Sequence, residues 1–189
     1  MEHARLFLAC DIGEEVQDRL ETAVGALAPH VPGARWVRRA SRHLTFRFFG
    51  TLPLDRVRGI DRAVAAAGAG ETALSFELCG MGVFPSWEKP RVLWAGVGEG
   101  ADEVRALGER LNDTCACEGF GEESRQFVPH VTLARITRGG ASCGAKEEIS
   151  SRYASARFGR VDPEELVLYS SELTPAGPEY TRVASWPLG

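Results

Sequence analysis

His43-Leu44-Thr45-Phe46 and His130-Val131-Thr132-Leu133 are two copies of one pattern, 87 positions apart, and both lie in stretches typical of β-strands. Side chains alternate between the two faces of a strand, so the histidine and the threonine of each copy share one face. The two apolar residues of each copy point the other way, and we expect them to anchor the strand in a core. Two such strands facing one cleft would form a symmetric polar site.

The residue types in this pattern suit general acid-base chemistry on a phosphate ester. Histidine titrates near ~6.5, so one imidazole can accept a proton while the other delivers one. Threonine hydroxyls can donate hydrogen bonds to phosphoryl oxygens where negative charge accumulates. A single His-x-Thr on a strand often arises by chance, but here two copies use half of the four histidines.

Length and composition favour a compact soluble protein. The chain has 189 residues and 44% hydrophobic content, which suits one unit or two closely packed lobes. No apolar run approaches the ~18 residues that a membrane helix needs. No charged, then apolar, then small-residue leader precedes Leu6, and the five cysteines are odd in number and irregularly spaced. We therefore expect a monomer in the cytoplasm.

The Cys115-Ala-Cys117 stretch is a weak zinc signal, because no second Cys or His pair follows at a suitable spacing. We interpret it as packing at a helix end, and we expect no metal and no cofactor.

The charge distribution argues against a protein that coats long nucleic acid, because the net charge is −4. The local charge near the two motifs is basic instead, and nearly all of it is arginine. Planar guanidinium groups suit phosphate recognition, although a generally arginine-rich chain would show the same clusters. The arginines near the first copy are Arg35, Arg38, Arg39, Arg42 and Arg47, and those near the second are Arg125, Arg135 and Arg138.

Apolar periodicity divides the chain into two similar series of elements. The first series is a strand over residues 5–11, a helix over 13–27, the motif strand over 43–49, a helix over 54–67 and a strand over 74–78. The second is a strand over residues 91–97, a helix over 102–115, the motif strand over 131–136, a weaker helix over 146–153 and a strand over 166–170.

A duplicated strand-helix-strand-helix-strand unit explains this repetition. The opening strands are offset by 86 positions, from Leu6 to Val92, and the motifs by 87. We expect a single domain, 1–189, of two intertwined lobes with repeat halves of about 4–83 and 90–174. Repeats of this kind pack about an approximate two-fold axis, so His43 and His130 should meet across a shared groove.

Residues 85–90, which include Pro85 and Pro90, are expected to form the loop between the lobes. The aromatic residues Phe84 and Trp87 in this region are candidates for stacking on a nucleobase, since aromatic faces accept any base. Ordinary loop packing is the alternative.

The motifs and their surroundings resemble the LigT-like RNA 2′,3′-cyclic phosphodiesterases, within the 2H phosphoesterase superfamily. The resemblance covers nearly the whole chain, from Arg5-Leu6-Phe7-Leu8-Ala9 to Trp186-Pro187-Leu188. Between these ends it includes residues 43–50, Phe84-Pro85, residues 90–94, residues 125–135 and Tyr180.

This resemblance implies an α+β, bilobal, pseudo-two-fold fold in which two antiparallel sheets line a central groove and helices lie outside. It implies metal-independent hydrolysis of a terminal 2′,3′-cyclic phosphate on RNA to a 2′-phosphomonoester. His43 matches the proton donor to the departing 3′-oxygen, and His130 matches the proton acceptor. Thr45, Thr132 and Arg135 match phosphate-binding positions, and Arg125 is a weaker candidate. The substrates implied are RNA ends or short oligonucleotides, including tRNA halves.

Two departures from the family pattern stand on the motif strand: Phe46 replaces a commonly aliphatic residue, and Phe48-Phe49 is bulkier than usual. Neither changes the polar face. Some family members also join or cleave 2′,5′ linkages, and this activity stays open.

Two other functions remain as alternatives. Gly96-Val97-Gly98-Glu99-Gly100-Ala101 matches G-x-G-x-x-A between a strand and a helix, a pattern that can hold the pyrophosphate of a dinucleotide. Glu118 lies near the distance expected of a ribose-binding acid but follows no second apolar strand, so a plain strand-to-helix turn explains the glycines better. A noncatalytic RNA-end or nucleotide-binding protein is the second alternative.

Overall fold

The computed structural model describes residues 2–123, 126–136, 143–175 and 177–189. Nine strands and four α-helices make up this part of the chain. In chain order they are β1 (His3–Cys10), α1 (Glu14–Leu27), β2 (Ala34–Trp36), β3 (Leu44–Pro53), α2 (Val57–Ala66), β4 (Phe76–Phe84), β5 (Val92–Val97), α3 (Ala101–Cys117), β6 (His130–Ile136), α4 (Cys143–Glu148), β7 (Arg157–Val161), β8 (Glu165–Thr174) and β9 (Gly177–Pro187).

The ten elements expected from apolar periodicity are confirmed, with shifted ends. Strand β3 continues past Gly50 to Pro53, β4 runs to Phe84, and the weak helix divides into α4 and a π-helical segment, Ile149–Tyr153. Three strands, β2, β7 and β9, were not expected. Because β7 and β9 are the two end strands in the strand order, the sequence interpretation missed both edges of the sheet.

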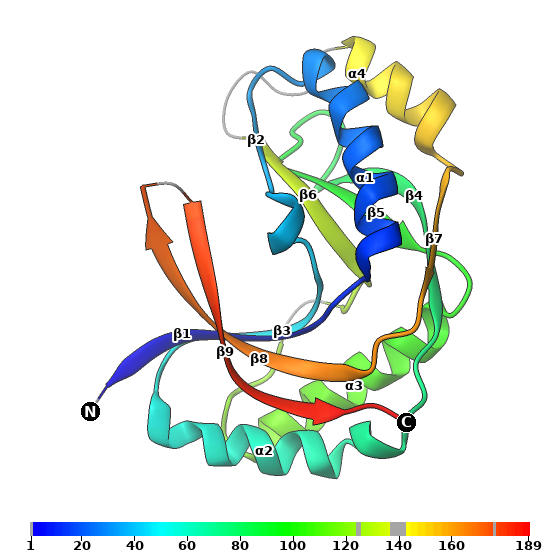
Figure 1. The fold of residues 1–189 in the computed structure, drawn as a ribbon. Helices are drawn as coiled ribbons and strands as arrows, with labels where there is room; N and C mark the ends of the chain where they lie inside the picture. The colour runs from blue at the N-terminus through cyan, green and yellow to red at the C-terminus, as the bar shows by residue number, and fades with distance from the viewer. Residues whose placement is uncertain (1, 124–125, 137–142, 176) are drawn as a thin grey trace.

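All strand pairs are antiparallel, and the strand order is β7-β4-β5-β6-β3-β1-β8-β9, with β2 on β6. Only one residue pair, Leu44 with Val131, joins β3 to β6. The expected bilobal antiparallel fold is therefore confirmed, but its two sheets meet at this one point and form a single sheet. Helices α2 and α3 lie beneath β1, β3, β8 and β9, and α1 and α4 lie beside the other section (Figure 1).

Each section of the sheet contains strands from both halves of the chain. Strand β8 pairs with β1 in one section, and β7 pairs with β4 in the other. The expectation that residues 85–90 connect the lobes is wrong, because this segment joins β4 to β5 within one section. No sequence pattern near Pro85 distinguishes a hairpin from a linker between lobes.

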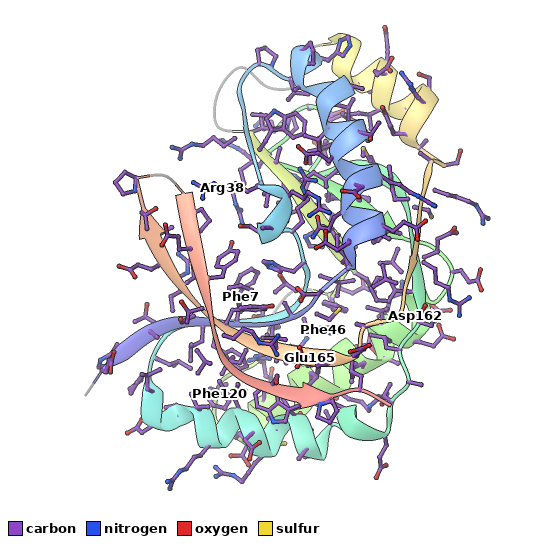
Figure 2. All side chains as sticks on the ribbon, viewed as in Figure 1. Phe7, Arg38, Phe46, Phe120, Asp162 and Glu165 are labelled. Carbon is purple, nitrogen blue, oxygen red and sulfur yellow. The ribbon has the colours of Figure 1, made fainter. Side chains whose placement is uncertain are left out.

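One continuous core lies between the sheet and its helices. Leu6, Leu8 and Cys10 of β1 are fully buried, as are Leu107 and Leu111 of α3. Phe46 and Phe120 lie on this core side, while Phe7 lies on the opposite face of the strands (Figure 2). The helices in the described ranges are all too short or too polar to cross a membrane.

Candidate active site

The two motif strands meet at the junction between the sheet sections. Leu44 and Val131 are directly opposite each other, and both are fully buried. Alternation then puts His43 and Thr132 on the other face as one cross-strand pair, and Thr45 and His130 as the next. Each histidine therefore lies beside the threonine of the other motif.

This interleaved pairing sets the spacing of the two imidazoles. In this register His43 and His130 are diagonal neighbours, which in antiparallel sheets usually lie about 7–8 Å apart, with their Cβ atoms somewhat closer. A phosphoryl group can lie between two side chains at this spacing and contact both.

A cavity of about 510 Å³ opens over this face of the sheet, and it is basic. Four arginines and no Asp or Glu are among its lining residues, although the chain as a whole is acidic. The lining includes Arg5, Phe7, Arg35, Arg38, His43, Thr45, Phe48, Thr132, Arg135, Leu173 and Tyr180. The β8–β9 hairpin rises on one side and the segment between β2 and β3 on the other (Figure 1). Arg38 and Phe7 lie at opposite ends of this space (Figure 2).

The arginines near the first motif divide into two groups. Arg35 and Arg38 line the cavity. Arg39 forms ion pairs with Glu14 and Asp18 on α1. Phosphate steering was open for all five of these arginines, and only two of them lie where they could contact a bound phosphate.

Arg42 and Arg47 are buried and hold the fold together. Arg42 pairs with Glu21 at 2.5 Å, and Arg47 donates to the side-chain oxygen of Asn112 at 2.8 Å and to the Gly121 carbonyl at 2.6 Å. Buried guanidinium groups need several acceptors, and these contacts satisfy part of that need, since Arg42 Nη1 and Arg47 Nε are buried without a partner. Arg125 and Arg138 lie outside the described residues.

His43 lies in an aromatic environment. Its ring stacks on Phe7 at 4.8 Å, and Tyr180 meets it edge-on at 5.4 Å. Burial lowers the pKa of His43 to about 4, while a hydrogen bond with the backbone of Ser41 acts in the opposite direction. The free protein therefore holds this imidazole neutral at pH 7.

His130 has one ring nitrogen fixed by the backbone. Its Nδ1 lies 2.7 Å from the Val128 carbonyl, and a carbonyl can only accept, so Nδ1 carries the proton. The other nitrogen, Nε2, is then left with a lone pair. Burial lowers the pKa of His130, the Val128 carbonyl raises it, and the charge of Arg135 lowers it further. A neutral imidazole with a free Nε2 suits a proton acceptor.

The two base-stacking candidates lie away from the cavity lining. Phe84 meets the His130 ring edge-on at 5.1 Å and contacts Trp94 at the same centroid distance. Trp87 packs against the main core. Base stacking by either residue stays a prediction.

Other sequence signals have structural explanations. Within the described ranges, no three His, Cys, Asp or Glu side chains gather as metal ligands. Cys115 is buried and Cys117 exposed at the end of α3. The glycine-rich turn ends at Gly100, where φ is +80° and an added Cβ would lie 2.3 Å from the Ser75 carbonyl oxygen. Since β5 lies between two antiparallel neighbours, the turn does not belong to a parallel dinucleotide-binding unit.

The cavity lining includes residues that were not assigned to the site from the sequence, among them Arg5, Phe7 and Tyr180. Alternation in β1 contains a usable signal, since Arg5 and Phe7 point away from buried Leu6 and Leu8. For Tyr180 the signal is long-range, because the β8–β9 hairpin reaches the site only through the pairing of β8 with β1.

Two His-x-Thr strands paired beneath an arginine-lined cavity define a 2H phosphoesterase. The chain belongs to the family of LigT-like phosphoesterases, whose model matches it twice, over residues 11–94 and 96–180.

Curated relatives agree with this assignment, and a solved structure shares the fold. A relative from Aquifex aeolicus named RNA 2′,3′-cyclic phosphodiesterase is 32% identical over 82% of each chain. One of the same name from Geobacillus stearothermophilus is 29% identical over 100% of this chain, which spans only 58% of that relative. The structure of Escherichia coli LigT complexed with 3′-AMP shares the fold, with a TM-score of 0.80, 21% identity and 99% of each chain covered.

Proposed function

We propose that this protein hydrolyses the terminal 2′,3′-cyclic phosphate of RNA to a 2′-phosphomonoester by general acid-base catalysis without a metal. The observation that supports this proposal is the pairing of the two motifs at Leu44 and Val131, which turns both histidines and both threonines to one face of the sheet. Three of these four residues, His43, Thr45 and Thr132, line the basic cavity, and His130 is the neighbour of Thr132 in β6 by alternation. The family and the names of the curated relatives support the same reaction.

In the proposed reaction, His130 is the base and His43 the acid. Nε2 of His130 takes a proton from water, and the water oxygen forms a bond to phosphorus. The bond from phosphorus to the 3′-oxygen breaks, and His43 delivers a proton to that oxygen. The phosphate stays on the 2′-oxygen, and proton exchange with solvent restores both imidazoles. General acid and general base contribute about 10²- to 10⁴-fold each.

Binding of the substrate would favour the protonated form of His43, the proposed acid. Burial keeps His43 neutral in the free protein, but an anionic phosphate favours the imidazolium form and raises the pKa of a histidine beside it. Thr45, Thr132 and Arg135 would hold the non-bridging oxygens as charge develops. Losing one such donor costs on the order of 10² in rate.

The substrates we propose are RNA ends and short oligonucleotides, including tRNA halves, and the protein would act as a cytoplasmic monomer. A 5′-hydroxyl in place of water would give a 2′,5′ linkage by the same steps, so RNA ligation is a secondary proposal. Arg125 is proposed as an additional phosphate contact from its sequence position alone.

The test is hydrolysis of an oligoribonucleotide that ends in a 2′,3′-cyclic phosphate, in EDTA, with the 2′- and 3′-phosphate products resolved. We expect the 2′-phosphate from the wild type and at least a 10²-fold lower rate from His43→Ala and His130→Ala. His30→Ala serves as the control, because His30 belongs to neither His-x-Thr motif and lies in the short segment Ala28–His30 after α1.

Near-normal rates in either motif variant would contradict the catalytic assignment. Tight binding of the cyclic-phosphate end by the wild type without any product would favour the alternative, a noncatalytic RNA-end or nucleotide-binding protein.

A further inference from the structure

Phe48 is a large apolar side chain that the fold leaves in solvent. It is 53% exposed and lines the cavity. Isolated exposed apolar residues are common on protein surfaces, but one inside a polar binding cavity indicates a ligand contact.

The position of Phe48 relative to His43 is fixed by the sheet. Phe48 pairs with Phe7 across β3 and β1, with ring centroids 5.8 Å apart, and Phe7 stacks on His43. Phe7 is only 2% exposed, so its ring offers no free face to a ligand. The accessible aromatic surface in this direction is therefore the ring of Phe48, which the buried ring of Phe7 separates from His43.

The cavity that Phe48 lines carries charges that suit a phosphodiester backbone. Arg5 and Arg35 line the same cavity, and neither forms a salt bridge with a carboxylate among the residues that the structure describes. Leu173 on β8, 73% exposed, adds an apolar contact on the hairpin side. A basic groove with an aromatic platform is how proteins hold single-stranded nucleic acid without reading its sequence.

We propose that Phe48, Arg5 and Arg35 form a subsite for the nucleotide that precedes the one bearing the cyclic phosphate. The base of that nucleotide stacks on Phe48, and its phosphodiester lies near the two arginines. The inference rests on the proposed function and narrows its substrate: oligonucleotides of two or more residues are preferred over mononucleotide cyclic phosphates.

The experiment compares kcat/KM for a mononucleotide and a dinucleotide, both ending in a 2′,3′-cyclic phosphate. The wild type should favour the dinucleotide, and Phe48→Ala should lower the dinucleotide-to-mononucleotide ratio about tenfold, the effect expected from losing one stacked base. Phe48→Trp should keep the ratio. Val183→Ala is the control, because Val183 is an exposed apolar residue outside the cavity, and it should leave the ratio unchanged.

A ratio that Phe48→Ala does not change would overturn the subsite, and so would equal losses on both substrates, which would assign Phe48 to the terminal base. If the wild type hydrolysed neither substrate, the proposed function would fail instead. The subsite would then be judged by calorimetric binding of mono- and dinucleotide 2′-phosphates, with the same tenfold change in ratio expected for Phe48→Ala.

Discussion

At the scale of single residues, burial decides how the two histidines respond to pH. The reaction needs one neutral and one protonated imidazole, and the two apparent pKa values belong to the pair. Both are lowered in the free protein, that of His43 to about 4. The productive population falls as pH drops below the lower pKa, and it falls again as pH rises above the higher one. We expect a bell-shaped kcat/KM profile whose maximum lies below pH 6.5.

The same argument predicts a different profile for kcat, because a bound anionic phosphate raises the pKa of both imidazoles. The kcat maximum should lie at higher pH than the kcat/KM maximum, and both can be measured between pH 3.5 and 8.5 on a dinucleotide substrate. A flat kcat/KM profile, or a maximum above pH 7, would show that these two imidazoles do not control the rate.

At the scale of elements, apolar periodicity predicts helices and strands that bury one face. It fails for exposed strands, which only the hydrogen bonds to a neighbouring strand hold in place. Helix α1 was found because Val16, Leu20 and Leu27 recur at helical spacing and face the core. Strand β9 was missed because most of its residues are exposed, so it lacks the alternation of apolar and polar residues that marks a half-buried strand. The site divides in the same way: alternation within one strand predicts His43 with Thr45, whereas the contact of Tyr180 with His43 requires the register of four strands.

Two glycines in neighbouring strands make room for one large side chain of the β4–β5 hairpin. An added Cβ at Gly82 would lie 2.4 Å from the Trp94 ring, and one at Gly96 would lie 3.1 Å from it. Trp94 pairs with Thr132 and contacts Phe84, so its displacement would reach the motif strand. We predict that Gly82→Ala lowers the free energy of unfolding by about 1–3 kcal/mol, the usual cost of overpacking.

The matched control for this substitution is Gly25→Ala on α1. An added Cβ at Gly25 meets nothing within 4 Å, and alanine favours a helix over glycine, so this variant should be stabilised by about 0.5–1 kcal/mol. Urea unfolding measures both values. Equal stability of Gly82→Ala and the wild type would mean that the indole can move without cost.

At the scale of the whole molecule, strands of each repeat half pair with strands of the other half. The complete chain is therefore the folding unit. We propose that the repeat halves, about 4–83 and 90–174, belong to one domain 1–189 and are not independent. In the described fold β4 lies between β5 and β7, both from the second half, and β1 lies between β3 and β8. A fragment of residues 1–89 would leave β4 without either neighbour, and a fragment of 90–189 would leave β8 without β1.

In each fragment some strand edges are unpaired and only half of the core is present. The remaining burial does not offset the loss of conformational entropy on ordering the chain. We therefore predict that neither fragment, 1–89 or 90–189, unfolds cooperatively or hydrolyses a cyclic phosphate by itself. Mixing them should restore both properties, because each histidine comes from a different fragment and the Leu44–Val131 pair forms only between the two. Circular dichroism melts measure cooperative unfolding of each fragment and of the mixture, and the hydrolysis assay measures their activity. A cooperative melt of either fragment alone would contradict the interdependence, since it would require one half to bury its own core without the strand that the other half supplies.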